Sequence, residues 1–238
     1  MADLTQANKN AFDEFAATYD LDPWQLQLSS MLATYLQQNK DWIGAQWTSA
    51  KDPRPVKLLD YACGTGAASV ALKPFVTTIT GLDISEGMVD RYNIAMSKLG
   101  YTPQEAHGAV ADITNSDYDH LPEVNEHYDV AIISLALHHV PEPELLLKAL
   151  AKRLKLATGV LIVVDFLPFE HAHKGHKHKM AHTVKQHGFN ERQTADLYKL
   201  AGFEDFGFIV VPERVKIGEE EKGAVSHRDM FIARGRLV

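Results

Sequence analysis

The feature that most constrains the fold of this chain is a glycine-rich turn between an apolar run and a helix-compatible segment. The apolar run ends at Asp60, Gly64 and Gly66 follow it, and residues 67–72 are rich in alanine. This order of strand, tight turn and helix is typical of nucleotide-binding α/β folds. Glycine permits backbone conformations that a Cβ forbids and lets a ligand approach the main chain closely. We therefore expect a nucleoside-containing cofactor at this turn.

A second carboxylate indicates which cofactor this is. The next predicted strand, residues 77–82, is followed by Asp83, which is suitably placed to accept hydrogen bonds from both hydroxyls of a ribose. The pyrophosphate of a dinucleotide would lie beside Asp60 and be repelled, and Ser69 stands where dinucleotide folds usually have Gly or Ala. S-adenosylmethionine has no phosphate, and its amino and sulfonium groups are cationic. The acidic turn therefore favours S-adenosylmethionine over a nicotinamide cofactor.

Residues 60–66 and 81–85 together resemble motifs I and II of the class I S-adenosylmethionine-dependent methyltransferases. The N-terminal pattern from Phe12 to Asp20 is similar to that of the small-molecule branch related to the ubiquinone and menaquinone C-methyltransferases. The resemblance extends from residue 10 to the end of the chain. It implies an α/β, Rossmann-like fold with a doubly wound sheet of seven strands in the order 3-2-1-4-5-7-6, of which strand 7 is antiparallel.

The expected cofactor contacts lie at and after the carboxyl ends of the first four strands. They are Asp60, Ala62, Gly64, Gly66, Asp83, Ile84, Met88, Asp112, Ile113 and Ser134. By the resemblance, Asp112 accepts a hydrogen bond from the adenine amine, and Ile84 and Met88 enclose the adenine ring. Ile84 and Met88 also suit ordinary core packing, and an acid after a strand is a common turn residue.

The catalytic candidates are Tyr19, His138 and His139. Residues 128–140 are almost continuously apolar, which predicts a strand buried on both faces of a parallel sheet. Ligands of open parallel sheets bind beyond the carboxyl ends of the strands, so both histidines are expected near the transferred methyl group. They also suit a structural role, with an imidazole bonded to a backbone carbonyl. By the resemblance, Tyr19 closes over the cofactor as a lid; otherwise it anchors the N-terminal helix.

We expect one methyltransferase domain over residues 1–238, because this length supports one large core. Its parts are N-terminal lid and pocket helices at 1–50, a cofactor-binding core at 56–165, a histidine-rich cap at 166–189, and a C-terminal helix and hairpin at 190–238.

The histidine-rich cap departs from the common pattern of the family. It holds His171, His173, His176, His178, His182 and His187, which are half of the twelve histidines. They suit proton transfer to or from an acceptor, because the pKa of imidazole lies near neutral pH. Two His-x-His pairs suggest a metal site as an alternative, but no cysteine joins them, and we expect no metal. A solvated basic loop is the third interpretation.

Composition limits the class of partner. The net charge of −7 and the isoelectric point near 5.9 argue against a nucleic-acid or anionic-membrane binder. The single cysteine, Cys63, excludes an internal disulfide, and neither a signal peptide nor a membrane-spanning run is present. We expect a cytoplasmic monomer or homodimer that methylates a small molecule. Methylation of protein or tRNA, or a regulatory subunit that binds the cofactor without turnover, stays open.

Overall fold

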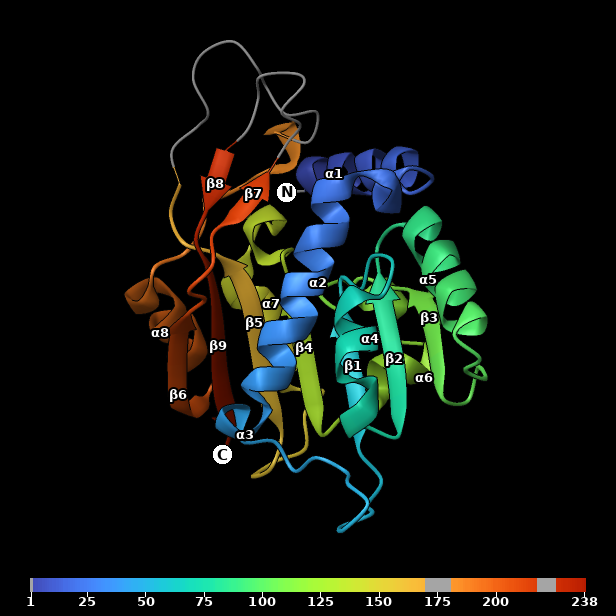
Figure 1. Ribbon diagram of the computed structural model, residues 1–238, viewed down its shortest axis with the longest axis vertical. Helices are drawn as coiled ribbons and strands as arrows, with labels where there is room; N and C mark the ends of the chain where they lie inside the picture. The colour runs from blue at the N-terminus through green and yellow to red at the C-terminus, as the bar shows by residue number, and fades with distance from the viewer. Residues whose placement is uncertain (1, 170–180, 218–225) are drawn as a thin grey trace.

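A central sheet of seven strands organises the computed structural model, which describes residues 2–169, 181–217 and 226–238. The strands are β1 (Lys57–Tyr61), β2 (Thr78–Asp83), β3 (Ala106–Val110), β4 (Val130–Ser134), β5 (Val160–Phe166), β6 (Phe203–Val210) and β9 (Met230–Leu237). Their order is β3-β2-β1-β4-β5-β9-β6, with β9 antiparallel to both of its neighbours (Figure 1). The predicted fold class and strand order are confirmed.

Helices cover both faces of this sheet (Figure 1). They are α1 (Ala2–Phe15), α2 (Pro23–Gln38), α3 (Lys40–Ile43), α4 (Ala67–Leu72), α5 (Glu86–Lys98), α6 (Pro122–Asn125), α7 (Pro143–Ala151) and α8 (Glu191–Leu200). The apolar sides of α2, α4 and α5 pack on one face, and those of α6, α7 and α8 pack on the other. Helix α1 lies across the carboxyl ends of the parallel strands.

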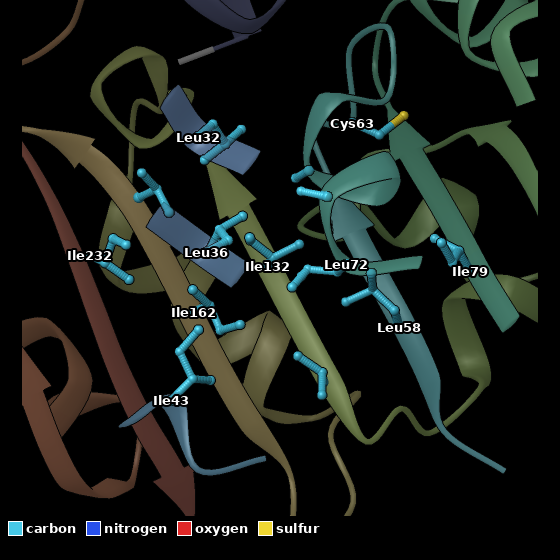
Figure 2. Packing of buried hydrophobic residues seen from close by; sticks show 14 of the residues in the cluster. Leu32, Leu36, Ile43, Leu58, Cys63, Leu72, Ile79, Ile132, Ile162 and Ile232 are labelled. Atoms are coloured by element: carbon cyan, nitrogen blue, oxygen red, sulfur yellow. The ribbon is translucent and has the colours of Figure 1, made fainter. Parts of the chain in front are cut away.

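Alternation along the strands explains why they are apolar throughout. Ile132 of β4 joins the cluster that contains Leu36 of α2 and Leu72 of α4 (Figure 2), whereas its neighbour Ile133 joins the cluster on the opposite face. Successive side chains of a strand point to opposite faces, so a strand covered on both sides needs apolar residues at every position.

Apolar residues at helical spacing predict helices over residues 10–20 and 143–156, and both helices end earlier than this pattern predicts. Helix α1 ends at Phe15, and Tyr19–Leu21 forms a separate 3-10 turn. Asp22 is extended because it precedes Pro23, which disfavours a helical conformation there. The helix expected over residues 143–156 ends at Ala151.

A small hairpin outside the main sheet was not predicted. Its strands are β7 (Val215–Ile217) and β8 (Ser226–Arg228). The hairpin that the sequence predicts within 190–238 is the one formed by the last two strands of the main sheet, here β6 and β9, and the acidic stretch from 212 to 225 between them is interpreted from sequence as a loop. Val215 and Ile217 are buried in the cluster that contains α2, which explains why this short strand forms. Within the described part of the chain, no helix is both long and apolar enough to cross a membrane.

Candidate active site

The turn between β1 and α4 adopts left-handed backbone conformations. Ala62, Gly64 and Gly66 have φ angles of 56°, 52° and 99°. A Cβ on Gly66 would lie 2.6 Å from Cε of Met96, so this position accepts only glycine without rearrangement. A positive φ is unfavourable for alanine, and such strain is concentrated at functional sites in proteins. The close turn exposes main-chain atoms next to the end of β2.

Asp83 joins this turn to the segment after β2. Its Oδ2 accepts a hydrogen bond from the backbone N–H of Gly64 at 2.9 Å, and its Oδ1 accepts one from the N–H of Ser85 at 3.0 Å. The residue is 8% exposed, and burial raises the pKa of its carboxyl although these amides oppose the rise. The two sequence motifs therefore meet at one carboxylate.

Asp60 lies beneath the turn. Its Oδ2 accepts hydrogen bonds from the N–H of Ser69 at 3.0 Å and from Oγ of Ser69 at 2.7 Å, and that hydroxyl lies 2.9 Å from the Tyr92 hydroxyl. Asp60 Oδ1 is buried without a hydrogen-bond partner among the described residues. Burial raises the pKa of Asp60 to about 7, against the hydrogen bonds from Ser69. Asp60 thus holds the start of α4 in place.

Helix α1 is tied to the segment after β2. Asp13 Oδ1 accepts hydrogen bonds from Oγ of Ser85 at 2.6 Å and from the N–H of Gly87 at 3.0 Å, and Lys9 Nζ lies 2.9 Å from Asp13 Oδ2. Burial opposes ionisation of Asp13, but the bonds from Ser85, Gly87 and Lys9 lower the pKa of its carboxyl. These contacts fix the C-terminal half of α1 over the site.

Tyr19 follows α1 and stands in the cavity wall. Its ring meets that of Phe15 edge to face, with the centroids 5.4 Å apart. Burial, with the nearby charges of Asp20 and Asp83, raises the pKa of Tyr19 to about 12. Asp20 accepts a hydrogen bond from Oγ1 of Thr65 at 2.8 Å, which ties this segment to the glycine turn.

The two histidines after β4 have different surroundings. The Nδ1 of His138 donates to Oδ1 of Asp165 at 2.7 Å, and its backbone N–H donates to Oδ2 at 3.0 Å. Both residues are buried. The Nδ1 of His139 lies 3.0 Å from both the backbone oxygen and Oγ1 of Thr183. The two rings are 4.1 Å apart.

These elements enclose one cavity beneath α1. It is lined by Thr5, Asn8, Phe12, Tyr19, Tyr61, Ala62, Gly64, Asp83, Ile84, Met88, Asp112, Thr114, Ser134, Leu135, Ala136, His139, Val140, Pro141 and Leu146. The carboxylate of Asp112 is oriented by Thr114, whose N–H and Oγ1 lie 2.9 and 2.6 Å from its Oδ1. The wall combines two carboxylates, an imidazole and apolar surface.

Nine of the thirteen residues predicted for the site line this cavity. The other four, Asp60, Gly66, Ile113 and His138, are not among the lining residues. Leu135 lines the cavity as well, as its place directly after the fourth predicted strand indicates, and it has a φ of 55°, which its sequence neighbourhood does not signal. Sequence reasoning missed Thr5 and Asn8. Asn8 and Thr5 are ordinary polar helix residues by sequence.

The histidine-rich cap is described only in part. Four of its histidines lie outside the described residues: His171, His173, His176 and His178. The structure therefore does not test the cap and metal interpretations at those positions. His182 is exposed, His187 packs its ring 5.3 Å from that of Phe169, and neither lines the cavity. The parts of the chain that the structure describes contain no group of three His, Cys, Asp or Glu residues suited to a metal.

Comparison with known proteins finds methyltransferases. The family described as "Methyltransferase domain" matches residues 32–211. An uncharacterized methyltransferase of Schizosaccharomyces pombe is 25% identical over 231 residues, which cover 84% of this chain and 80% of the relative. A 2-phytyl-1,4-naphtoquinone methyltransferase of Synechococcus elongatus is 26% identical over 166 residues, which cover 68% of this chain and 65% of the relative.

Solved structures agree on the fold. The crystal structure of a SAM-dependent methyltransferase from Aquifex aeolicus matches with a TM-score of 0.61 at 18% sequence identity, covering 95% of this chain and 98% of that one. A Bacillus halodurans structure described as a putative methyltransferase matches with a TM-score of 0.60 at 15% identity, covering 84% of this chain and 97% of that one.

Proposed function

Because the chain belongs to the methyltransferase-domain family, we propose that it methylates a small-molecule acceptor in the cavity beneath α1, with S-adenosylmethionine as methyl donor. The observation that carries this proposal is an enclosed cavity in which the acidic end, at Asp83, is continuous with a wall that contains His139. A cofactor and a small acceptor would meet there.

The residues of the cavity fit this cofactor. Its described lining includes the carboxylates of Asp83 and Asp112 but no lysine or arginine, which suits a cationic ligand without phosphate. Asp83 would bind the ribose hydroxyls, and Asp112 would bind the adenine amine beside Ile84 and Met88. We call these four residues, with Ala62 and Gly64, the cofactor end of the cavity.

We call the opposite wall the acceptor end; it consists of Asn8, Phe12, Leu135 and His139. When bound, the cofactor supplies a methyl group on a cationic sulfur, which a nucleophile of the acceptor displaces. The chain must align that nucleophile and exclude water. Helix α1 serves both needs, because Asn8 holds it to His139 and Asp13 holds it to the segment after β2.

His139 is the residue that we propose as the base for a hydroxyl, thiol or amine acceptor. Its Nδ1 lies beside the backbone oxygen of Thr183, which only accepts, and we propose the neutral tautomer in which Nδ1 carries the proton and Nε2 acts as the base. His138 does not line the cavity, and its Nδ1 is engaged by Asp165. We therefore propose His138 as a positioning residue that fixes the backbone and ring of its neighbour.

A small acceptor is supported by the enclosure of the cavity and by the naphthoquinone acceptor in the name of one relative. The acceptor atom, whether oxygen, sulfur, nitrogen or carbon, is left open. We further propose a cytoplasmic enzyme, monomeric or homodimeric, that binds no nucleic acid, in keeping with the net charge of −7.

Methyl transfer from labelled S-adenosylmethionine into a cell extract tests this function. The extract is separated after reaction into small-molecule and macromolecular fractions. We expect the label in the small-molecule fraction, where the labelled compound identifies the acceptor. Label confined to protein or RNA would contradict the proposal in favour of polymer methylation. No label despite measurable binding of S-adenosylhomocysteine would favour a regulatory subunit.

A further inference from the structure

Asn8 is a buried polar residue of α1 that stands in the wall of the cavity, and it is 5% exposed. Its Nδ2 donates a hydrogen bond to the backbone oxygen of His139 at 3.0 Å. A carbonyl oxygen only accepts, so the nitrogen of the amide must face it, and the orientation of the amide is fixed. Asn8 Oδ1 is therefore directed away from this carbonyl.

Asn8 Oδ1 has no donor within hydrogen-bonding distance among the described residues, although it is shielded from solvent. Such an atom is unfavourable unless something supplies a donor, and buried polar groups in folded proteins are nearly always paired. Asp60 Oδ1 is also unpaired, but Asp60 is not among the lining residues. Asn8 is thus the residue at which an unpaired buried oxygen and the described cavity wall coincide.

The neighbours of Asn8 place it at the acceptor end. It is bonded to the loop after β4, and Phe12, one turn further along α1, meets the ring of His139 edge to face at 5.4 Å. The cofactor end is held separately, by the hydrogen bonds of Asp83 to Gly64 and Ser85. A donor that reaches Asn8 from inside the cavity would therefore lie beside His139.

We propose that Asn8 Oδ1 accepts a hydrogen bond from an O–H or N–H group of the methyl acceptor, and that the enzyme selects acceptors by this group. This inference rests on the proposed function and narrows its substrate class. A protic acceptor such as an alcohol, phenol, amine or amide pairs the oxygen. An acceptor without such a group leaves it unpaired and buried, which is the physical basis on which polar pockets reject analogues.

The test compares Asn8→Leu, Asn8→Asp and the matched control Asn10→Ala, which changes an exposed residue of the same helix. Labelled S-adenosylmethionine and the small-molecule fraction of an extract serve as probes, and the initial rate of labelling is measured. We expect Asn8→Leu to lower the rate about tenfold or more. Both Asn8 variants lose the hydrogen bond that Nδ2 donates to His139, so the difference between them reports on Oδ1. Asn8→Asp retains an accepting oxygen and should lose less of the labelling rate than Asn8→Leu, and Asn10→Ala should match the wild type.

Two further readouts separate this role from others. Affinity for S-adenosylhomocysteine should stay within about twofold of the wild type in Asn8→Leu. Trypsin cleavage after Lys9, which reports release of α1, should accelerate equally in Asn8→Leu and Asn8→Asp, because both variants lose the hydrogen bond to His139. An unchanged labelling rate, a parallel loss of S-adenosylhomocysteine affinity, faster cleavage of Asn8→Leu than of Asn8→Asp, or an equal loss of labelling rate in both Asn8 variants would overturn the inference. Absence of label with the wild type would instead contradict the proposed function.

Discussion

The two ends of the cavity are built from the sequence in different ways. At the cofactor end, Ala62, Gly64, Asp83 and Ile84 come from two neighbouring parallel strands and the turns that follow them. The side chain of Asp83 joins those turns, because its Oδ2 accepts a hydrogen bond from the backbone N–H of Gly64. This end is therefore assembled by local segments whose chemistry is visible in the sequence.

The acceptor end is assembled by contacts between distant segments. Asn8 and His139 are 131 positions apart in the chain, and Thr183, which orients the ring of His139, is 44 positions further on. Asp165 engages His138 across the ends of adjacent strands. Few side chains belong to both ends. We therefore expect mutations at one end to change cofactor affinity and mutations at the other to change the reaction with the acceptor.

The largest expected effect tests the cofactor end. Asp83→Ala removes the proposed ribose acceptor and the partner of two backbone amides, so the binding free energy of S-adenosylhomocysteine should weaken by about 2–3 kcal/mol. Titration calorimetry measures this change, which corresponds to a loss of affinity of roughly 30- to 150-fold. Asp90→Ala, an exposed carboxylate on α5, is the matched control. Unchanged affinity in Asp83→Ala would remove the assignment of this residue.

Next in size is a change at the acceptor end. Asp165→Asn weakens the hydrogen bonds that this buried carboxylate accepts from His138, so the free energy of unfolding should fall by about 2 kcal/mol. Affinity for S-adenosylhomocysteine should stay within about twofold of the wild type. Urea unfolding and calorimetry on the same samples give both values. A strong loss of cofactor affinity would show that the two ends are not separable.

The buried carboxyl of Asp60, beneath the glycine turn of the cofactor end, should make the folding stability depend on pH. Its folded-state pKa of about 7 lies above the value near 3.9 of an unfolded aspartate, so folding binds a proton between these values. Its contribution to stability is therefore fully present below about pH 4 and falls as pH rises towards 7. Asp60→Asn removes this dependence. The free energy of unfolding of Asp60→Asn minus that of the wild type should therefore be larger at pH 8 than at pH 4, by about 1–2 kcal/mol. Urea unfolding between pH 4 and pH 8 measures both proteins. If their free energies of unfolding change with pH in the same way, the raised pKa of Asp60 is refuted.

The smallest expected effect concerns helix α1, which contacts both ends of the cavity. Asp13→Ala removes the acceptor for Ser85 and Gly87 and should loosen α1 by about 1 kcal/mol. Limited proteolysis with trypsin should then cleave after Lys9 roughly fivefold faster. Glu14→Ala on the exposed side of the same helix serves as control. Equal cleavage rates in the two variants would indicate that α1 is held by apolar contacts alone.

The sequence predicts the cofactor end of the cavity better than the acceptor end. The strand order, the glycine turn and the placement of Asp83 and Asp112 on the cavity follow from local patterns and from the family resemblance. The sequence does not predict the hydrogen bonds between Asp60 and Ser69. A carboxylate before a glycine turn gives the same sequence pattern whether it faces the ligand or lies beneath the turn. Asp60 is bonded to Ser69, whose hydroxyl in turn contacts Tyr92 on a later helix, and the sequence does not show that these residues meet.

The sequence predicts fewer residues of the acceptor end, and the reason is physical. Nothing local distinguishes Asn8 from Asn10, yet one is buried over the cavity and the other is exposed, because the direction in which α1 crosses the sheet selects between them. The hairpin of β7 and β8 was missed because its strands are short, and their stability comes from packing of Val215 and Ile217 rather than from their own pattern.

Amide hydrogen exchange with and without S-adenosylhomocysteine tests the central claim, that the cofactor binds in the cavity under α1. We expect slower exchange on binding at residues 62–66 and 83–89, with further slowing at 12–20, which includes two residues of the cavity wall, and no change in α8. Slowing confined to other parts of the chain, or none at residues 62–66 and 83–89 at saturating ligand, would contradict the claim.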